Sequence, residues 1–558
     1  MAEHSKSNHL SGRSAFLSLL KQEGVRRIFG NPGTTELPIM HALSDEPDMG
    51  YVLGLQESIV VAMADGYARA SGELTAINLH VAPGLGNAIG ALYTSYVSGT
   101  PMIVTAGQQE QGHGLMEPLL YASLVPIAAP VVKWATEVTR LEDLPRIVHR
   151  AAKVAMTPPT GPVFISLPGD ILNAEGTLEL GAPTRVDTVV RPSDAALTRC
   201  ADRLLAAKRP VIIAGHEVVT GDAFDEVAAF ASTLGAPVFQ QTVAQGAHFP
   251  STHPAYRGAL GRDQKRVRAL LAPYDLLVVL GADVLKMSVW SATEPLPPGL
   301  AILQIGERDW EMGKNFPTEI ALRADLKETL TALTPLLASR GGASLAARAR
   351  DSLTALASTN WSAERAKKQQ ALNQQRDRAP LNPDWLMASL VERLPEDAII
   401  VDEGITSTYA LPALFPYRDR YSFFGNVSGG IGWGIAAAIG VQIAQPRRRV
   451  VAIIGDGSAM YSIQALWTAA NQKLPIVFIL PSNGGYRILR QRLKLFHGND
   501  RPIGMTLDNP TIDLAGLAHA LGLDAHRVET AAAFEARLDE AVRASGPVLL
   551  EIVVDRAT

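Results

Sequence analysis

The sequence has very little cysteine, since Cys200 is the only one among its 558 residues. A single cysteine excludes an internal disulfide and is typical of a reducing compartment, so we expect a cytoplasmic location. In ALTRCADRLL this cysteine has the spacing of one wall of an amphipathic helix, which argues against a nucleophilic role.

The sequence also lacks a long apolar run and an excess of either charge. The most apolar stretch, residues 429–444 (GGIGWGIAAAIGVQIA), is too short and too rich in glycine for a membrane span, and we expect a buried helix. Residues 1–14 are polar and have no apolar core of the kind found in a secretory signal. With a formal net charge of −4, we expect neither nucleic acid nor a membrane as a partner.

What the chain does contain is an internal repeat. Under a shift of 374 residues two pairs of segments match without a gap: 62–70 with 436–444, and 91–104 with 465–478. The identical positions include Gly66, which aligns with Gly440. A single shift that serves both segments indicates two related domains.

Strand patterns alternate with helical patterns in three parts of the chain. We therefore predict an α/β protein with three doubly wound parallel-sheet domains, the first and third related by internal duplication. The expected boundaries are 10–185 for the first domain, 190–340 for the central α/β domain and 380–558 for the last. The charged, alanine-rich segment 341–379 is expected to be a helical linker.

Two polar residues are expected at the ends of consecutive strands in the last domain. An apolar strand runs into Gly455-Asp456-Gly457-Ser458, and the next strand ends at Asn483-Gly484-Gly485. The carboxyl ends of parallel strands meet at one edge of a sheet, where ligands bind. An Asp, an Asn and a loop carbonyl suit Mg²⁺ with a phosphate, and the glycines let backbone amides approach that phosphate. The alternative is a tight turn in which Asp456 caps a helix.

The two copies of the repeat differ at one position of interest, where the first has an acid, Glu57, and the second has an apolar residue, Ile431. A carboxylate at the start of an apolar helix is poorly hydrated, which favours sharing a proton with a ligand nitrogen. The alternative is that Glu57 only caps its helix.

These features together resemble the thiamine diphosphate enzymes of the pyruvate decarboxylase and acetolactate synthase superfamily: GDGS, then Asn483 27 positions after Asp456, and Glu57 in the related domain. Within that superfamily the chain looks most like benzoylformate decarboxylase. The segments that carry this likeness are NPGTTELP (31–38), LQESIVVAMADGYARASG (55–72), NLHVAPGLGNAIGAL (78–92), VTAGQQ (104–109) and GDGSAMYSIQALWTAA (455–470).

The resemblance implies two cofactors, thiamine diphosphate and Mg²⁺. It assigns the metal to Asp456, Asn483 and the carbonyl of Gly485. The cofactor-binding residues that it adds are Gly457, Ser458 and Tyr486 at the diphosphate, and Glu57, Gly429 and Ile431 at the pyrimidine. Of these, Ile431 would support the bent cofactor, a carbonyl near Gly429 would accept from the pyrimidine amino group, and Glu57 would hydrogen-bond the pyrimidine N1′.

The resemblance also implies a reaction, the loss of CO₂ from a small 2-oxo acid to give an aldehyde, with possible carboligase activity. His80 matches the family's acid–base histidine, and Thr34 matches a serine that binds the substrate carboxylate. Because Glu57 and Asp456 belong to different domains, the resemblance implies a homodimer or homotetramer with sites between subunits.

Three positions depart from the family pattern and leave the substrate side chain open. Ser288 aligns with a second active-site histidine, and Gly425 and Arg492 align with large apolar residues of an aryl pocket. A bulky or acidic 2-oxo acid is therefore compatible with the sequence. The sequence is also compatible with two other functions. One is an acetolactate-synthase-like carboligase or flavin-dependent oxidase with FAD on the central domain, and the other is a non-catalytic protein that binds the cofactor.

Overall fold

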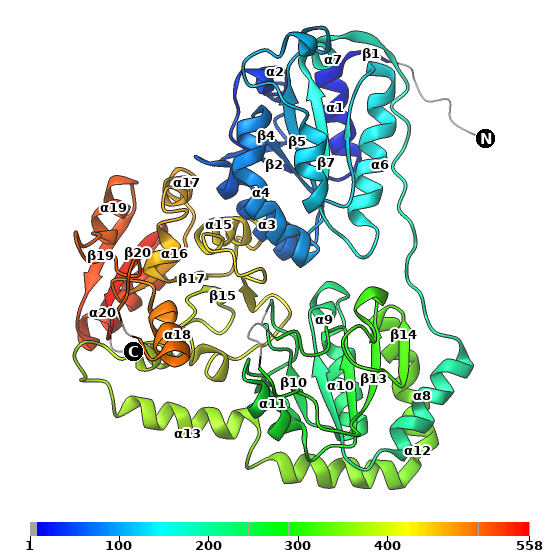
Figure 1. Ribbon diagram of the computed structural model, residues 1–558, viewed down its shortest axis with the longest axis vertical. Helices are drawn as coiled ribbons and strands as arrows, with labels where there is room; N and C mark the ends of the chain where they lie inside the picture. Colours follow the sequence, from blue (N-terminus) through cyan, green and yellow to red (C-terminus); the bar gives the residue numbers. More distant parts are fainter. Residues whose placement is uncertain (1–7, 244, 288–290, 500, 557–558) are drawn as a thin grey trace.

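Three parallel six-stranded sheets with helices on their faces make up the chain (Figure 1). The computed structural model describes residues 8–243, 245–287, 291–499 and 501–556. The inner strands are almost continuously apolar and buried, as expected when helices cover both faces of a parallel sheet. This confirms the predicted α/β class with three doubly wound sheets.

The first sheet has the spatial order β3-β2-β4-β5-β7-β6. Its strands are β2 (Arg27–Gly30), β3 (Gly50–Leu53), β4 (Thr75–Leu79), β5 (Met102–Gln108), β6 (Ala135–Glu137) and β7 (Val163–Pro168). Its main helices are α1 (Gly12–Gln22), α2 (Leu37–Leu43), α3 (Glu57–Ser71), α4 (Val81–Ser98) and α6 (Leu144–Met156). The short strands β1 (Asn8–Ser11) and β8 (Glu175–Leu178) form a separate antiparallel pair.

The last sheet has the order β16-β15-β17-β18-β20-β19, which is the same order as the first when strands are counted along the chain. Its strands are β15 (Ile399–Glu403), β16 (Phe423–Gly425), β17 (Val450–Ile454), β18 (Val477–Ser482), β19 (Asp524–Val528) and β20 (Val548–Val553). Its main helices are α14 (Pro383–Arg393), α15 (Gly434–Ala444), α16 (Asp456–Ala459), α17 (Ala465–Asn471), α18 (Arg487–His497), α19 (Leu514–Ala520) and α20 (Ala531–Arg543). The shared order agrees with the internal duplication predicted from the repeat.

The central sheet has a different order, β11-β10-β9-β12-β13-β14, so it is not a third copy of the same unit. Its strands are β9 (Pro210–Ala214), β10 (Val238–Gln240), β11 (Tyr256–Ala259), β12 (Leu276–Leu280), β13 (Ala301–Gly306) and β14 (Ile320–Arg323). Its main helices are α8 (Asp194–Ala206), α9 (Glu217–Thr220), α10 (Phe224–Leu234) and α11 (Gln264–Leu271). The connection onward is helical, through α12 (Leu326–Leu356), kinked at Gly342, and α13 (Trp361–Asn373). The exact domain boundaries stay predictions.

The first and last domains meet through the equivalent helices α3 and α15. The apolar segment of the sequence forms α15, and its residues from Gly434 to Gln442 are buried. A Cβ atom on Gly66 of α3 would lie 2.2 Å from the carbonyl oxygen of Ala437, and one on Gly440 of α15 would lie 1.9 Å from that of Met63. Glycine is therefore required on both helices for this close approach.

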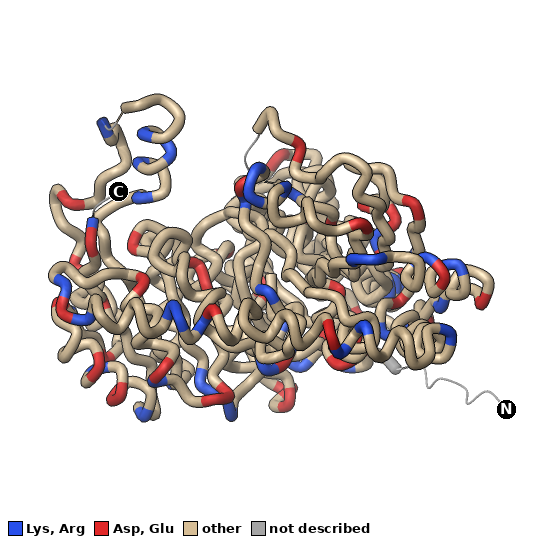
Figure 2. The backbone as a smooth tube through the Cα atoms, turned by 90° about the horizontal axis from the view of Figure 1, so that it is seen from below, with Lys and Arg blue, Asp and Glu red and all other residues tan. Residues whose placement is uncertain are grey.

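Charges are mixed over most of the chain, with Lys and Arg interspersed among Asp and Glu (Figure 2). Helix α18, RILRQRLKLFH, is strongly basic, with four basic residues besides its histidine and no acid. Among the described residues, no helix has both the length and the apolarity that crossing a membrane would require.

Candidate active site

Glu57 is the first residue of α3, and its side chain is directed by two amides. Gln56 caps the helix by accepting from the backbone N–H groups of Ser58 and Ile59, so the Glu57 carboxylate is not needed as the cap. Its Oε1 accepts from Asn31 Nδ2 at 3.3 Å and its Oε2 from Asn87 Nδ2 at 3.0 Å. With 8% of its surface exposed, Glu57 is a buried carboxylate without a cation partner among the described residues. Sequence reasoning missed both asparagines.

His80 follows β4 directly and stands at the carboxyl edge of the first sheet. Its Nδ1 lies 2.9 Å from Glu36 Oε2 and 3.0 Å from Thr35 Oγ1. A Cβ on Gly33 would come within 2.2 Å of this ring, so the ring packs directly on a glycine backbone. Among the described residues Nε2 has no hydrogen-bond partner, and this nitrogen can therefore face a ligand.

Glu36 is the residue that fixes this histidine, and it was not predicted. Its carboxylate accepts from the backbone N–H groups of Gly33 at 2.8 Å and Gly107 at 2.9 Å, and from Thr35 Oγ1 at 2.7 Å. With these bonds satisfied and 1% of its surface exposed, its position is set by the fold. An acid bonded to Nδ1 of a histidine favours the tautomer or cation that has a proton on that nitrogen.

Thr34 begins the short helix η1 (Thr34–Glu36) and is exposed. Its hydroxyl has no hydrogen bond among the described residues, and it is Thr35 and Glu36 that contact His80. A role for Thr34 in substrate binding therefore stays a prediction.

Asp456 lies at the carboxyl edge of the last sheet, as the strand pattern predicts. Its Oδ1 accepts from Gly457 N at 2.8 Å, and its Oδ2 accepts from Asn483 N at 2.9 Å and Gly484 N at 2.7 Å. These bonds join the β17 turn to the β18 turn. Burial raises the pKa of the Asp456 carboxyl, and the hydrogen bonds from these three amides oppose that rise.

The groups around Asp456 fit a cation with a diphosphate. Among the described residues the Asn483 side-chain amide has no hydrogen bond, and the Gly485 carbonyl accepts only from Arg487 N, at 3.0 Å. A Cβ on Gly457 would lie 2.5 Å from the Tyr486 ring, so a larger side chain at this position would overlap that ring. In the described part of the chain no cluster of three His, Cys, Asp or Glu side chains could hold a metal. One carboxylate with neutral oxygen donors is a set that suits Mg²⁺ when phosphate oxygens and water complete its shell.

Gly429, Ile431 and Ser458 lie on the same edge of this domain. Gly429 has φ = 81° in the segment between β16 and α15, and Ile431 is partly buried two residues later. Ser458 belongs to α16 and is 7% exposed. The structure therefore brings the predicted metal ligands and the predicted cofactor residues of this domain to one sheet edge.

The three departures from the family pattern have different surroundings. Gly425 ends β16, and its carbonyl oxygen accepts from Arg69 at 3.3 Å, while Arg69 also donates to the Gln245 carbonyl at 2.6 Å. The Gly425 N–H also donates to the Gln245 carbonyl at 3.1 Å, so Gly425 contacts both of the other domains. Arg492 lies on α18, and its guanidinium carbon is 5.6 Å from the centroid of the Phe496 ring. Ser288 lies outside the described residues.

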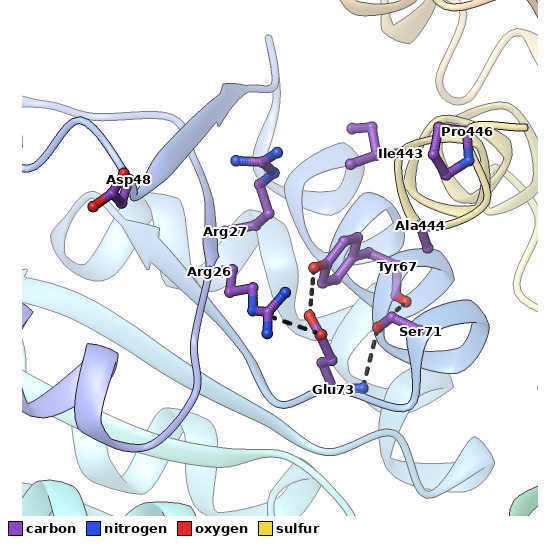
Figure 3. Close-up of a pocket in the computed structure, with 9 residues that line it drawn as sticks. All are labelled: Arg26, Arg27, Asp48, Tyr67, Ser71, Glu73, Ile443, Ala444 and Pro446. Atoms are coloured by element: carbon purple, nitrogen blue, oxygen red, sulfur yellow. Dashed lines mark hydrogen bonds and ion pairs between the residues drawn. The ribbon is translucent and has the colours of Figure 1, made fainter.

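A cavity lies elsewhere, at the opposite end of α3 (Figure 3). Its volume is about 310 Å³, and Arg26, Tyr67, Glu73 and Ile443 contribute to its lining. Tyr67 Oη donates to Glu73 Oε2 at 2.7 Å, and Arg26 Nε lies 3.8 Å from Glu73 Oε1, so these polar groups are bound to one another. Since none of the predicted site residues lines it, this cavity is not the candidate active site.

The carboxyl edge of the central sheet is filled by a side chain of the chain itself. Between β9 and β12 the strand order reverses, which is where open α/β sheets bind nucleotides. There the Glu217 carboxylate accepts from Glu307 N at 2.8 Å. A Cβ on Gly306 would lie 2.6 Å from Glu217 Oε2, and one on Gly281 would lie 2.5 Å from Glu217 Cβ. Burial raises the pKa of Glu217 to about 7.

Comparison with known proteins follows the same three-part division. Family models described as thiamine pyrophosphate enzyme domains match residues 10–118 (N-terminal TPP binding), 197–333 (central) and 404–552 (C-terminal TPP binding). Benzoylformate decarboxylase of Pseudomonas aeruginosa is 34% identical over 97% of this chain and 98% of its own length. The acetolactate synthase large subunit of Haemophilus influenzae is 27% identical over 98% of this chain and 95% of its own length.

Solved structures agree with these sequence relatives. The thiamine diphosphate-dependent 4-hydroxybenzoylformate decarboxylase of Rhodococcus jostii RHA1 has a TM-score of 0.86 at 31% identity, covering 98% of this chain and 100% of its own. Benzoylformate decarboxylase from Polynucleobacter necessarius has a TM-score of 0.87 at 30% identity, covering 98% and 99%. With all three domain models matched and relatives above 30% identity along almost its whole length, the chain belongs to the thiamine pyrophosphate enzymes.

Proposed function

We propose that the protein is a thiamine diphosphate- and Mg²⁺-dependent decarboxylase that converts a benzoylformate-like 2-oxo acid to an aldehyde and CO₂. The observation that carries this proposal is the His80–Glu36 pair at the carboxyl edge of the first sheet. It leaves Nε2 free to exchange a proton with a substrate, which is what an aldehyde-forming decarboxylation requires after CO₂ leaves. The likeness to two benzoylformate decarboxylases and a 4-hydroxybenzoylformate decarboxylase supports the same reaction.

The last domain would hold the cofactor. Asp456, the Asn483 side chain and the Gly485 carbonyl would hold Mg²⁺, with Gly457, Ser458 and Tyr486 beside the diphosphate. When bound, thiamine diphosphate supplies a carbon nucleophile and an electron sink for the electrons of the departing carboxylate. The chain itself binds, orients and moves protons.

The first domain would supply the proton chemistry. Glu57 would share a proton with the pyrimidine N1′, and the amides of Asn31 and Asn87 hold its two oxygens in place for that bond. His80 Nε2 would exchange a proton with the substrate oxygen or carbon. Thr34, exposed and unbonded beside this pair, is proposed to bind the substrate carboxylate.

We propose that two subunits form each site, in a homodimer or homotetramer. The hydrogen bonds of Glu57 all lie in its own domain, and so do those of Asp456. Large apolar side chains are exposed after β5, where Leu115 is 96% and Leu119 84% exposed. Such surface is typical of a contact with another chain. A cytoplasmic location belongs to the same proposal.

The flavin-dependent alternative is disfavoured by the central domain. A dinucleotide at the strand-order reversal needs glycine backbone that a phosphate or ribose can approach. Here Gly306 and Gly281 pack against Glu217, and Glu217 takes the amide of Glu307. We therefore expect a colourless protein without bound FAD.

The test is CO₂ release from phenylglyoxylate, pyruvate, branched-chain and dicarboxylic 2-oxo acids, with and without thiamine diphosphate and Mg²⁺. Glu57→Gln is the catalytic control, and aldehyde and acetolactate are measured in the same samples. Release that needs both cofactors and Glu57, with aldehyde as the product, is the expected result. If acetolactate is the main product, the protein is a carboligase and the proposed decarboxylase function is wrong. If no 2-oxo acid is turned over although the cofactor is bound, both the decarboxylase and the carboligase functions are wrong.

A further inference from the structure

Glu403 is a buried acid that the proposed chemistry does not use. It ends β15 at the carboxyl edge of the last sheet, and 4% of its surface is exposed. Among the described residues it has no cation partner, and burial raises its pKa to about 7. A carboxylate in such a place is tolerated only if neutral donors satisfy it.

Four neutral donors do so, and they come from both sides of one short segment. Oε1 accepts from Asn426 Nδ2 at 2.9 Å, from Gly432 N at 2.9 Å and from Trp433 N at 3.2 Å. Oε2 accepts from Gly434 N at 2.8 Å. Glu403 therefore pins residues 427–431 at their two ends and also binds the free amides at the start of α15.

The pinned segment, Val-Ser-Gly-Gly-Ile, contains two adjacent glycines and few other restraints. Ser428 N donates to Asn426 Oδ1 at 3.1 Å, and Gly430 N donates to Ser428 Oγ at 3.0 Å. Ser428 Oγ also lies 2.7 Å from Thr94 Oγ1 of α4. Since glycine leaves the backbone free to adopt many conformations, the shape of 427–431 depends on its anchors.

Trp433 ties the same anchor to the first domain. Its backbone N–H donates to Glu403, and its indole Nε1 donates to Asp65 of α3 at 2.8 Å. The Arg69 guanidinium lies 5.0 Å from the indole centroid. The side of the segment toward α15 is therefore rigid, and the remaining freedom lies in 427–431.

We infer that Glu403 is a positioning residue that fixes residues 427–431 in the shape that receives the pyrimidine end of the cofactor. This inference rests on the proposed function, which places Gly429 and Ile431 at that end. All four donors to Glu403 belong to residues that flank the segment, so Glu403 would act on the cofactor through the segment. Its effect should therefore appear in cofactor affinity, because a segment ordered in advance loses less freedom on binding.

The test compares Glu403→Gln with Asp402→Asn. A glutamine has one acceptor oxygen, and its NH₂ group would face a backbone N–H, so at least one of the four bonds is lost. Asp402 is the neighbouring residue on β15, and its Oδ1 accepts from Gly404 N at 2.9 Å instead of from residues that flank the segment. Asn426→Ala leaves the buried carboxylate in place and removes one of its four bonds, together with the bonds of Asn426 to Ser428 N and to the Gly430 carbonyl.

Two readouts are expected to change. In calorimetric titration with thiamine diphosphate and Mg²⁺, we expect Kd to rise at least tenfold for Glu403→Gln, about threefold for Asn426→Ala and less than twofold for Asp402→Asn. At saturating cofactor, kcat should return to within threefold of the wild type. In hydrogen exchange of the cofactor-free protein, the amides of Gly432, Trp433 and Gly434 should exchange faster in Glu403→Gln only.

The possible failures are distinct. A wild type that does not bind thiamine diphosphate would overturn the proposed function. A wild type that binds it while Glu403→Gln binds equally well, or exchanges its amides at the wild-type rate, would overturn the positioning role alone. If Glu403→Gln does not fold, an unchanged Kd for thiamine diphosphate in Asn426→Ala would overturn the positioning role.

Discussion

The His80–Glu36 pair gives the sharpest prediction about catalysis, because replacing Glu36 with Gln should damage the reaction through His80. Glu36 Oε2 lies 2.9 Å from His80 Nδ1, and the carboxylate also accepts from two backbone amides and from Thr35. Glutamine keeps the volume but has a single acceptor oxygen, so its NH₂ group must face a donor. In either orientation of that amide, His80 Nδ1 loses a negatively charged acceptor.

The magnitude follows from the bonds. One hydrogen bond to a charged group is worth about 1.5–3 kcal/mol, which corresponds to a factor of roughly 10–100 in rate. A positioned acid or base contributes roughly 10²–10⁴-fold. We therefore expect Glu36→Gln to lower kcat about 10–100-fold with little change in KM, and His80→Ala to lower it about 10²–10⁴-fold.

The assay is a double-mutant cycle on the 2-oxo acid that the wild type decarboxylates fastest, at saturating cofactor. If Glu36 acts through His80, the double variant should be no slower than His80→Ala. Thr35→Val, which removes one weaker neighbour of the same ring nitrogen, should cost less than Glu36→Gln. Equal losses from Glu36→Gln in the presence and absence of His80 would refute this reasoning.

Three further predictions concern the metal, the central domain and the contact between helices. Asp456→Asn places an amide NH₂ against backbone donors, so calorimetry should show Mg²⁺-dependent cofactor binding weakened more than tenfold; unchanged binding would contradict the site. The raised pKa of Glu217, about 7 against 4.5, means that its contribution to stability is full below pH 4.5 and is lost as pH rises through 7. At 1.36 kcal/mol per pKa unit this loss is ~3 kcal/mol. In denaturant unfolding, Glu217→Gln should therefore be more stable relative to the wild type at pH 8 than at pH 4.5. If the free energies of unfolding of the two proteins change with pH in parallel, this mechanism is excluded. Gly440→Ala should cost about 1–3 kcal/mol and lower Tm by several degrees, because the added methyl would overlap the Met63 carbonyl; an unchanged Tm would show that the helices can separate freely.

Much of the fold could be predicted because it depends on periodic features of the sequence. Apolar strands ending in Gly-Asp-Gly or Asn-Gly predict an edge where turns meet, and Asp456 does bind the amides of Asn483 and Gly484 there. The single shift of the repeat predicted that the first and last domains are related, and their strand orders are the same. These patterns are local, or recur at a fixed interval, so they can be seen without coordinates.

The supporting residues of the site could not be predicted in this way. Glu36 is buried against a histidine 44 residues away, and Glu403 is buried against amides 29 to 31 residues away. Acidic residues are usually exposed, so nothing in the sequence distinguishes Glu36 and Glu403 from solvated residues. Asn31 and Asn87 were missed for the same reason: Asn87 reaches Glu57 through the packing of α3 against α4, and Asn31 reaches it from the turn that follows β2.

The glycine contacts between α3 and α15 are reciprocal in a way that bears on the history of the chain. Gly66 approaches Ala437 and Gly440 approaches Met63, and the repeat that equates Gly66 with Gly440 also equates Met63 with Ala437. This is the geometry of a two-fold contact between identical subunits, here joined in one polypeptide. An ancestral pair of identical subunits would have had to place the same residue on both sides. Once the two copies were fused, one could keep an acid at Glu57 while the other took the branched Ile431.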